Sequence, residues 1–297
     1  AHLDGDRMHV TGPTFPGLPG FPIGHNEHLA WGLTNVGPDV QDLVIERFHS
    51  DDPLQVEFKG GYEPVTLREE VIRVRGGKDV TLQVRETRHG PVVTEFYDGV
   101  GEEVALRWTA LADDDATVVA FSQLAFATTV ESGMDAMRHY VAPAQNVVFA
   151  DTEGHIGWLA AGRYPLRADG GDGNLPVPGW DGAHEWTGWL PVEDWPRALD
   201  PERGFLASAN AKTVGPGYPH YLGDDFSAPY RTQRIVDRLE ASLPLDADEM
   251  AAIQDDVVSL LAVELMPTAE AAAIRGGLGD VMEGWDGSMD ADSAAAA

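Results

Sequence analysis

The alternation of apolar and polar residues divides the chain into strand-rich and helical parts. Residues 43–109 read as β-strands, because segments such as "LVIERF" and "EEVALRW" are rich in β-branched residues and are separated by turn residues. Residues 116–140 change to helical spacing, with a break predicted at Gly133. The segment "NVVFADTEGHIGWLAAG" predicts a β-hairpin in which "DTEG" forms the turn.

From residue 231 onward the spacing is helical, with a capping box at Asp246 and Glu249 and a helix end expected at Pro267. The short apolar run "GFLAS" (204–208) is predicted to be a buried strand. We therefore predict an α+β fold in one domain over 1–297. It is expected to be mainly β over 1–115 and 141–210 and helical over 116–140 and 231–297.

Composition narrows the classes of function. The net charge of −29 argues against nucleic-acid binding, which needs clustered lysines and arginines. The absence of cysteine excludes disulfides and thiolate metal sites. No apolar run reaches the roughly 18 residues that a membrane span requires, so no membrane span is expected. The acidic surface favours solubility and is compatible with life at high salt.

Both ends of the sequence suggest a piece of a longer chain. It starts at Ala1 without a methionine, and it stops in "MDADSAAAA", a helix-forming run without a cap or a breaker. We therefore expect a fragment.

Polar residues gather in "GHNEHLAWGLTNVGPDVQDLVIER" (24–47). For His25 a buried imidazole that satisfies loop backbone groups is favoured over a metal ligand. Asp39 and Asp42 lie three apart in a proline-shaped loop and suit a hard cation such as Ca²⁺. From spacing alone, however, a pair of turn-capping aspartates is the favoured interpretation.

Two later stretches offer weaker signals. Asn210 follows "GFLAS" and can present a fixed amide N–H to a developing oxyanion, while Arg231 opens a helix and can hold a carboxylate or an amide oxygen. Trp180, Trp186 and Trp189 lie in "PVPGWDGAHEWTGWLP" and form either a stacking platform for a sugar or, as we favour, a loop held by buried indoles.

Six segments, read in order, resemble the β chain of the penicillin acylase family over about residues 1–270. They are "PGLPGFPIGHNEHLAWGLTN" with "DVQDLVIER", then "ETRHGPVV", "PAQNVVFADTEGHIGW", "LPVPGWDG" and "GFLASANAK…YP…PYRTQRI". The resemblance implies an N-terminal nucleophile hydrolase with the four-layer αββα fold. In that family a precursor cleaves itself, and the serine that begins the β chain attacks an amide with its own α-amino group as base. The resemblance also implies an α chain of the same precursor, a small-molecule amide substrate and a periplasmic or secreted location.

The resemblance also implies roles for individual residues. Asn210 would donate its side-chain amide to the oxyanion, and the backbone N–H of Asn35 would be the second donor. Arg231 would orient Asn210 and the substrate, and Ile23 falls where the family lines its acyl pocket. Asp39 and Asp42, with the backbone carbonyl of Gln41, would bind a structural Ca²⁺. His25 and Asn26 then become the scaffold of the loop.

The nucleophilic serine of the family has no counterpart in these 297 residues. We therefore predict that this chain alone does not hydrolyse amides, whereas the intact parent does. Two alternatives stay open: an acyl-homoserine lactone or cephalosporin-type acylase on the same fold, and a calcium-binding module that recognises sugars.

Overall fold

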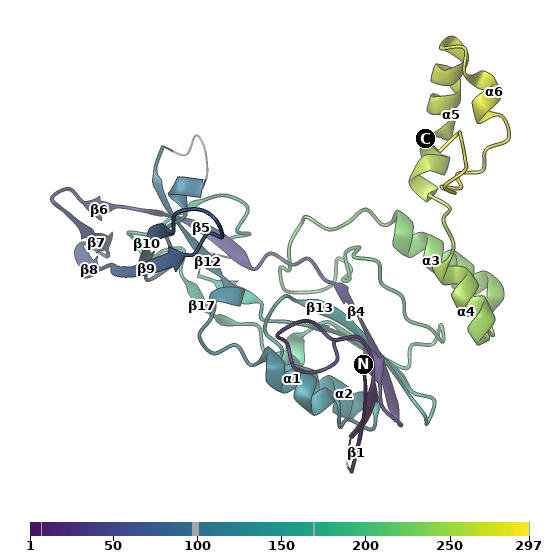
Figure 1. Ribbon diagram of the computed structural model, residues 1–297, viewed down its shortest axis with the longest axis horizontal. Coiled ribbons are helices and arrows are strands. Elements are labelled where there is room, and N and C mark those ends of the chain that lie inside the picture. The colour runs from purple at the N-terminus through teal and green to yellow at the C-terminus, as the bar shows by residue number, and fades with distance from the viewer. Residues whose placement is uncertain (7, 97–100, 169, 297) are drawn as a thin grey trace.

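The computed structural model describes residues 1–6, 8–96, 101–168 and 170–296. Its centre is a seven-stranded antiparallel sheet in the order β1-β2-β3-β4-β13-β14-β18 (Figure 1). The strands are β1 His2–Gly5, β2 Met8–Thr11, β3 Gly24–His25, β4 Leu29–Asn35, β13 Gln145–Asp151, β14 Ile156–Ala161 and β18 Arg197–Leu199. Strands β13 and β14 form the hairpin that the sequence predicts.

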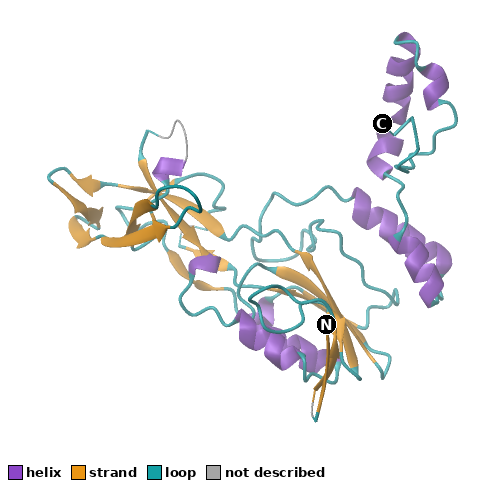
Figure 2. Cartoon of the chain, in the orientation of Figure 1, coloured by secondary structure: helices purple, strands orange, loops and turns teal. Residues whose placement is uncertain are grey.

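Helices α1 (Thr117–Leu124) and α2 (Val130–Ala136) cover one face of this sheet (Figure 2). Alternation along β4 turns Leu29 and Trp31 toward the helices, where both are buried in the main apolar core. The opposite face of the same strand carries Thr34. The sheet therefore has one face that packs on the helices and a second face that carries Thr34.

Smaller sheets form a second part of the molecule, drawn to the left in Figure 1. Strand β5 (Gln41–Glu46) continues from the loop after β4 and lies between β12 (Glu103–Trp108) and β16 (Val177–Pro178). The other strands are β6 Phe48–His49, β7 Asp52–Phe58, β8 Gly61–Pro64, β9 Thr66–Ile72, β10 Val80–Thr87, β11 Gly90–Pro91, β15 Pro165–Arg167 and β17 Trp186–Trp189.

The C-terminal part is helical and extends away from the sheet (Figure 1). It contains α3 Tyr230–Ser242, α4 Ala247–Gln254, α5 Leu260–Arg275 and α6 Gly279–Met282. The predicted capping box opens α4, where Asp246 and Glu249 each accept the backbone N–H of the other. Helices and antiparallel sheets together confirm the α+β class.

Three local predictions are wrong. Gly133 lies inside α2, and the helical segment breaks earlier, where Thr129 caps α2 by accepting the N–H of Ser132. The segment 204–208 is irregular and not a strand, and its Phe205 carbonyl accepts a hydrogen bond from Arg203 Nε at 2.9 Å. Pro267 lies inside α5, whose residues are all partly or fully exposed, so water can solvate the carbonyl that proline leaves unpaired.

Candidate active site

Asn35 ends β4 with its backbone N–H on an open edge. The backbone N–H of Val36 donates to the Ala144 carbonyl at 3.1 Å, so Val36 and Ala144 are a hydrogen-bonded pair at the end of the β4–β13 ladder. Antiparallel pairs alternate, so the neighbouring pair of Asn35 and Gln145 directs its backbone N–H groups away from the other strand. On its other side β4 pairs with β3 only at Ala30 and Trp31 within the described residues. The N–H and carbonyl of Asn35 therefore face the same unpaired edge.

Asn210 reaches this edge from a different part of the chain. Its side-chain Nδ2 donates to the Asn35 carbonyl at 3.0 Å, and its Oδ1 accepts from Arg231 at 3.0 Å. Arg231 is the second residue of α3, which fixes its position near the start of that helix. Asn210 itself has φ of +67°, a left-handed conformation that asparagine tolerates better than most residues. The structure thus brings Asn35, Asn210 and Arg231 into one array.

Two neighbouring amides, which the sequence analysis did not single out, complete the array. Gln145 Nε2 donates to Asn35 Oδ1 at 2.5 Å, on the helix-covered side of the sheet. Asn146 Nδ2 donates to the Asn35 carbonyl at 3.1 Å, and Asn146 Oδ1 accepts from Trp158 Nε1 at 3.0 Å. Both amides are buried in β13. Two adjacent amides in an apolar strand are the signal that would have pointed to them.

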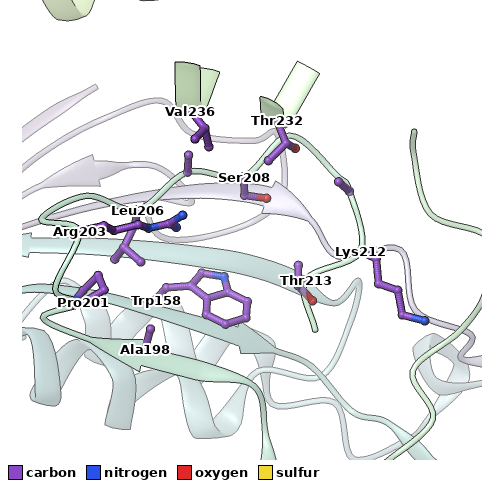
Figure 3. A pocket seen from close by; sticks show the side chains of 12 residues that line it. Trp158, Ala198, Pro201, Arg203, Leu206, Ser208, Lys212, Thr213, Thr232 and Val236 are labelled. Carbon is purple, nitrogen blue, oxygen red and sulfur yellow. The ribbon is translucent and has the colours of Figure 1, made fainter. Parts of the chain in front are cut away.

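A cavity of about 360 Å³, whose wall includes Ser208 and Ala211, lies on the second face of the sheet (Figure 3). Trp158 forms its floor, and Thr232 and Val236 of α3 face it from the opposite side. Ser208 Oγ, on the wall, lies 2.7 Å from the hydroxyl of Thr34. The serine that precedes Asn210 most closely therefore contacts a hydroxyl and not a base.

Ile23 lines a larger cavity, of about 630 Å³, on the helix-covered side of β4. Asn35 is part of the same wall, so the predicted pocket residue and the predicted backbone donor share one cavity. The lining is largely apolar and comes from the loop before β3, from β4, from α1 and from the segment before β13. Its residues are Phe15, Leu18, Pro22, Ile23, Leu33, Thr34, Asn35, Asp115, Thr117, Val118, Phe121, Tyr140, Ala142, Pro143 and Gln145.

Asn26 holds the loop that precedes β4. Its Nδ2 donates to the carbonyls of Ala125 and Ala127 at 3.2 and 2.7 Å, and its Oδ1 accepts the N–H groups of His28 and Leu29. His25 is exposed, which corrects the expectation of a buried imidazole. Its Nδ1 lies 3.1 Å from the Asn26 carbonyl, because β3 ends here at the sheet surface.

The predicted calcium ligands lie beside a cation that belongs to the chain. Arg167 donates to both oxygens of Asp42, with NH2–Oδ1 at 2.7 Å and Nε–Oδ2 at 3.0 Å, and its NH2 lies 3.3 Å from Asp39 Oδ1. Gln41, between the two aspartates, begins β5 opposite Trp108. Burial is the main reason why the pKa of Asp39 is raised, and the charge of Arg167 works in the opposite direction.

These residues do not fit calcium in this arrangement. Calcium takes about six to eight oxygens, and the Asp42 oxygens already accept from Arg167, so a dication between the carboxylates would also meet a guanidinium. Within the described ranges, no group of three or more His, Asp or Glu side chains is placed to hold a metal ion. The predicted calcium binding by Asp39, Gln41 and Asp42 is untested, and the contacts of Arg167 with both carboxylates argue against it.

The three tryptophans are engaged by protein groups. Trp186 Nε1 donates to Asp42 Oδ2, and Arg107 lies over the ring of Trp186. The guanidinium of Arg47 lies 3.4 Å from the ring centre of Trp180. Trp189 packs edge-to-face on Trp186 and is 41% exposed. These contacts hold the loop through its indoles, but none of the three tryptophans is fully buried, so the expectation of buried indoles is wrong.

Comparisons with known proteins identify the family of this chain. The penicillin amidase family model matches residues 1–297, and the chain belongs to that family. It is 39% identical to the penicillin acylase 2 proenzyme of Pseudomonas sp. (strain SE83), over 99% of this chain and 38% of that protein. It is 35% identical to the acyl-homoserine lactone acylase QuiP of Pseudomonas aeruginosa (strain PAO1), over 87% of this chain and 32% of that protein.

A solved structure shares the fold. The thermostable penicillin G acylase from Alcaligenes faecalis superposes with a TM-score of 0.80 and 23% identity, over 97% of this chain and 53% of that chain. The chain spans 38% and 32% of the length of the two curated relatives named above. None of the helices in the described residues has the length and apolar character needed to cross a membrane.

Proposed function

We propose that the protein that contains this chain hydrolyses a linear amide through an acyl-enzyme. One observation carries the proposal: Arg231, Asn210 and Asn35 form a hydrogen-bonded array at an open strand edge. Membership of the penicillin amidase family, whose relatives include a penicillin acylase and acyl-homoserine lactone acylases, supports the same chemistry.

The array suits a negative charge that develops on the carbonyl oxygen of the substrate. An asparagine amide has two N–H groups, and one of those on Asn210 is used by the Asn35 carbonyl. The second N–H of Asn210 and the backbone N–H of Asn35 would both face the substrate at this edge of β4 and stabilise the oxyanion. Arg231 holds Oδ1 and so fixes which atom of the amide faces the site. A preorganised donor of this kind lowers a barrier by about 3–4 kcal/mol.

We propose that the attacking serine comes from residues outside this chain, as the first residue of the family's β chain. Its Oγ would form a bond to the substrate carbonyl carbon while the Oγ proton passes to the α-amino group of the same serine. The C–N bond would then break as the amine accepts that proton. Water would then hydrolyse the ester, which releases the acid and restores the serine. The α chain of the same precursor would complete the site, and a periplasmic or secreted location would suit such processing.

The acyl group would enter the cavity lined by Ile23. Its apolar walls suit a hydrocarbon or aromatic acyl group, and Asn35 lies in the same wall. Cleavage of an acyl-homoserine lactone is the second candidate function, supported by relatives with that name at 35% identity. Rates on penicillin G and on an N-acyl-homoserine lactone, measured side by side, separate the two.

The proposal is tested by substitution of Asn210 in the full-length protein, meaning the gene product that contains these residues. Asn210→Ala should lower kcat about 100-fold or more with little change in the melting temperature. Because φ at Asn210 is +67°, Asn210→Gly is the matched variant that lacks the amide without backbone strain. Asn174→Ala, in an exposed loop, should leave the rate unchanged.

If Asn210→Ala loses rate but Asn210→Gly keeps the wild-type rate, the loss comes from backbone strain, and Asn210 is not part of the site. The purified 297-residue chain should show no amide hydrolysis above background. Turnover by that chain at rates near those of an enzyme would contradict the assignment of the nucleophile.

A further inference from the structure

Arg167 lies between the two aspartates of the loop that follows β4. Its guanidinium makes three contacts with the Asp42 carboxylate, at 2.7, 3.0 and 3.1 Å, and a fourth with Asp39 Oδ1 at 3.3 Å. The side chains of Arg167 and Asp42 are 6% and 4% exposed, and that of Asp39 is 18% exposed. Arginine suits this position, because its planar fork matches a carboxylate with two parallel N–H groups.

The surroundings close over this ion pair. Trp186 Nε1 donates to Asp42 Oδ2, so both oxygens of that carboxylate are occupied. Gly173, with φ of +73°, passes so close that a Cβ there would lie 2.5 Å from Arg167 NH2, Asp39 Oδ2 and Asp42 Oδ1. Backbone therefore occupies the space in which further oxygen ligands or water would have to approach a metal ion.

Without a metal ion, the two carboxylates and the guanidinium leave one net negative charge at this site. Two carboxylates share one guanidinium, and the exposed part of Asp39 keeps some contact with water. A dication placed between the same carboxylates would lie beside the guanidinium, and like charges at such short range repel strongly where water is scarce. The site can therefore hold the guanidinium of Arg167 or a dication, but not both.

We propose that Arg167 takes the place of the cation between Asp39 and Asp42 and fastens this loop without calcium. Backbone hydrogen bonds also hold the loop: the N–H of Val36 donates to the Ala144 carbonyl, and the N–H of Asp39 donates to the Leu222 carbonyl at 2.7 Å. Arg167 adds the tie to β15, so that the segment from β4 to β5 is fixed from both sides. This inference does not depend on the reaction proposed above.

Thermal melts of the full-length protein test the proposal. The wild-type melting temperature should be the same in EDTA and in millimolar calcium, and isothermal titration with calcium chloride should show no stoichiometric site. Arg167→Met leaves two partly buried carboxylates without their cation, so the melting temperature should fall by about 6–12 °C. Arg167→Lys keeps the charge but loses the planar fork, so its melting temperature should lie between those of wild type and Arg167→Met.

Arg163→Met is the matched control. Arg163 lies four residues earlier, pairs with Asp114, whose side chain is 75% exposed, and lies over the ring of Trp189, so its loss should lower the melting temperature by less than about 4 °C. A wild-type protein that loses stability in chelator and regains it with calcium would overturn the proposal. Equal melting temperatures for Arg167→Met and wild type would overturn it too. If Arg167→Met does not fold, the wild-type calcium titration and Arg167→Lys decide the question.

Discussion

Arg231 controls the direction in which the Asn210 amide points. Its NH2 donates to Asn210 Oδ1 at 3.0 Å, and this bond distinguishes the oxygen end of the amide from the nitrogen end. Arg231→Met removes the bond and lets the amide turn. A hydrogen bond to a charged group contributes about 1.5–3 kcal/mol, so kcat should fall about 10-fold to 100-fold in the full-length protein. Steady-state kinetics on an amide substrate measure the change.

The control for Arg231 lies on the same helix. Gln233 is exposed and bonds only its neighbour Asp237 among the contacts that the structure describes for its side chain, so Gln233→Ala should keep the wild-type kcat. A general weakening of α3 would affect both variants and their melting curves. A change in KM with an unchanged kcat would show that Arg231 binds substrate and does not position Asn210.

Sequence motifs located Asn35, Asn210 and Arg231, but not the residues that support them. Gln145 and Arg167 contact their partners across 110 and 125 residues of chain. Spacing along the sequence carries no information about such contacts. Gln145 lies in the segment "PAQNVVFADTEGHIGW", but the family resemblance supplied no role for it. A lone arginine in "PLRAD" also looks like an ordinary surface charge until the strand pairing places it beside Asp42.

At the scale of elements, Gly133 shows why a glycine in a helical pattern is ambiguous. It lies within α2 because a Cβ at this position would come 2.8 Å from Leu29 Cδ2 and 3.0 Å from Phe149. The helix therefore needs glycine for close packing on β4 and β13. Local pattern alone favoured a break, since glycine lowers helix propensity and tertiary contacts cannot be read from a single segment.

Gly133→Ala should therefore destabilise the protein although alanine favours a helix. The propensity gain is about 1 kcal/mol, whereas overpacking of a filled core costs about 1–3 kcal/mol, so the free energy of unfolding should fall by up to about 2 kcal/mol. Urea denaturation measures this change. Gly217→Ala, where a Cβ would have nothing within 4 Å, is the control. A gain in stability for Gly133→Ala would show that α2 can move off the sheet.

At the scale of the whole molecule, local patterns predicted the order of strands and helices better than their assembly. The hairpin of β13 and β14 pairs neighbours in sequence, and it was predicted correctly. The pairing of β4 with β13 joins segments 110 residues apart, and the division of the strands into one large and several small sheets depends on such pairs. Their partners are chosen by packing of the complete fold, which the polarity pattern of one strand does not contain.

A buried cluster of charges links four segments of the smaller sheets and makes stability depend on pH. His89 Nδ1 lies 2.8 Å from Glu46 Oε1, its Nε2 lies 2.7 Å from Glu185 Oε1, and Arg107 donates to Glu185 Oε2 at 3.0 Å. Ionised carboxylates only accept, so both ring nitrogens of His89 must carry protons. Burial opposes this charge, but the hydrogen bonds to Glu185 and Glu46 outweigh it and raise the pKa of His89 above 6.5. The hydrogen bond from His89 is the main reason why the pKa of Glu185 falls to about 2.

The sign of the pH dependence follows from these two shifts. The contribution of His89 is complete below 6.5, its unfolded pKa, and is lost as the pH rises through the higher folded value. The contribution of Glu185 is complete above 4.5 and is lost as the pH falls toward about 2. The cluster should therefore stabilise the protein most between pH 4.5 and 6.5.

His89→Gln leaves Glu46 buried without its cation, so the free energy of unfolding at pH 6 should fall by about 3–5 kcal/mol. Urea denaturation from pH 4 to 9 should show a smaller loss of stability above pH 6.5 in His89→Gln than in wild type. His155→Gln, which removes an exposed histidine bonded to Asp200, should keep the wild-type profile, and equal profiles for His89→Gln and wild type would mean that His89 is neutral in the folded protein.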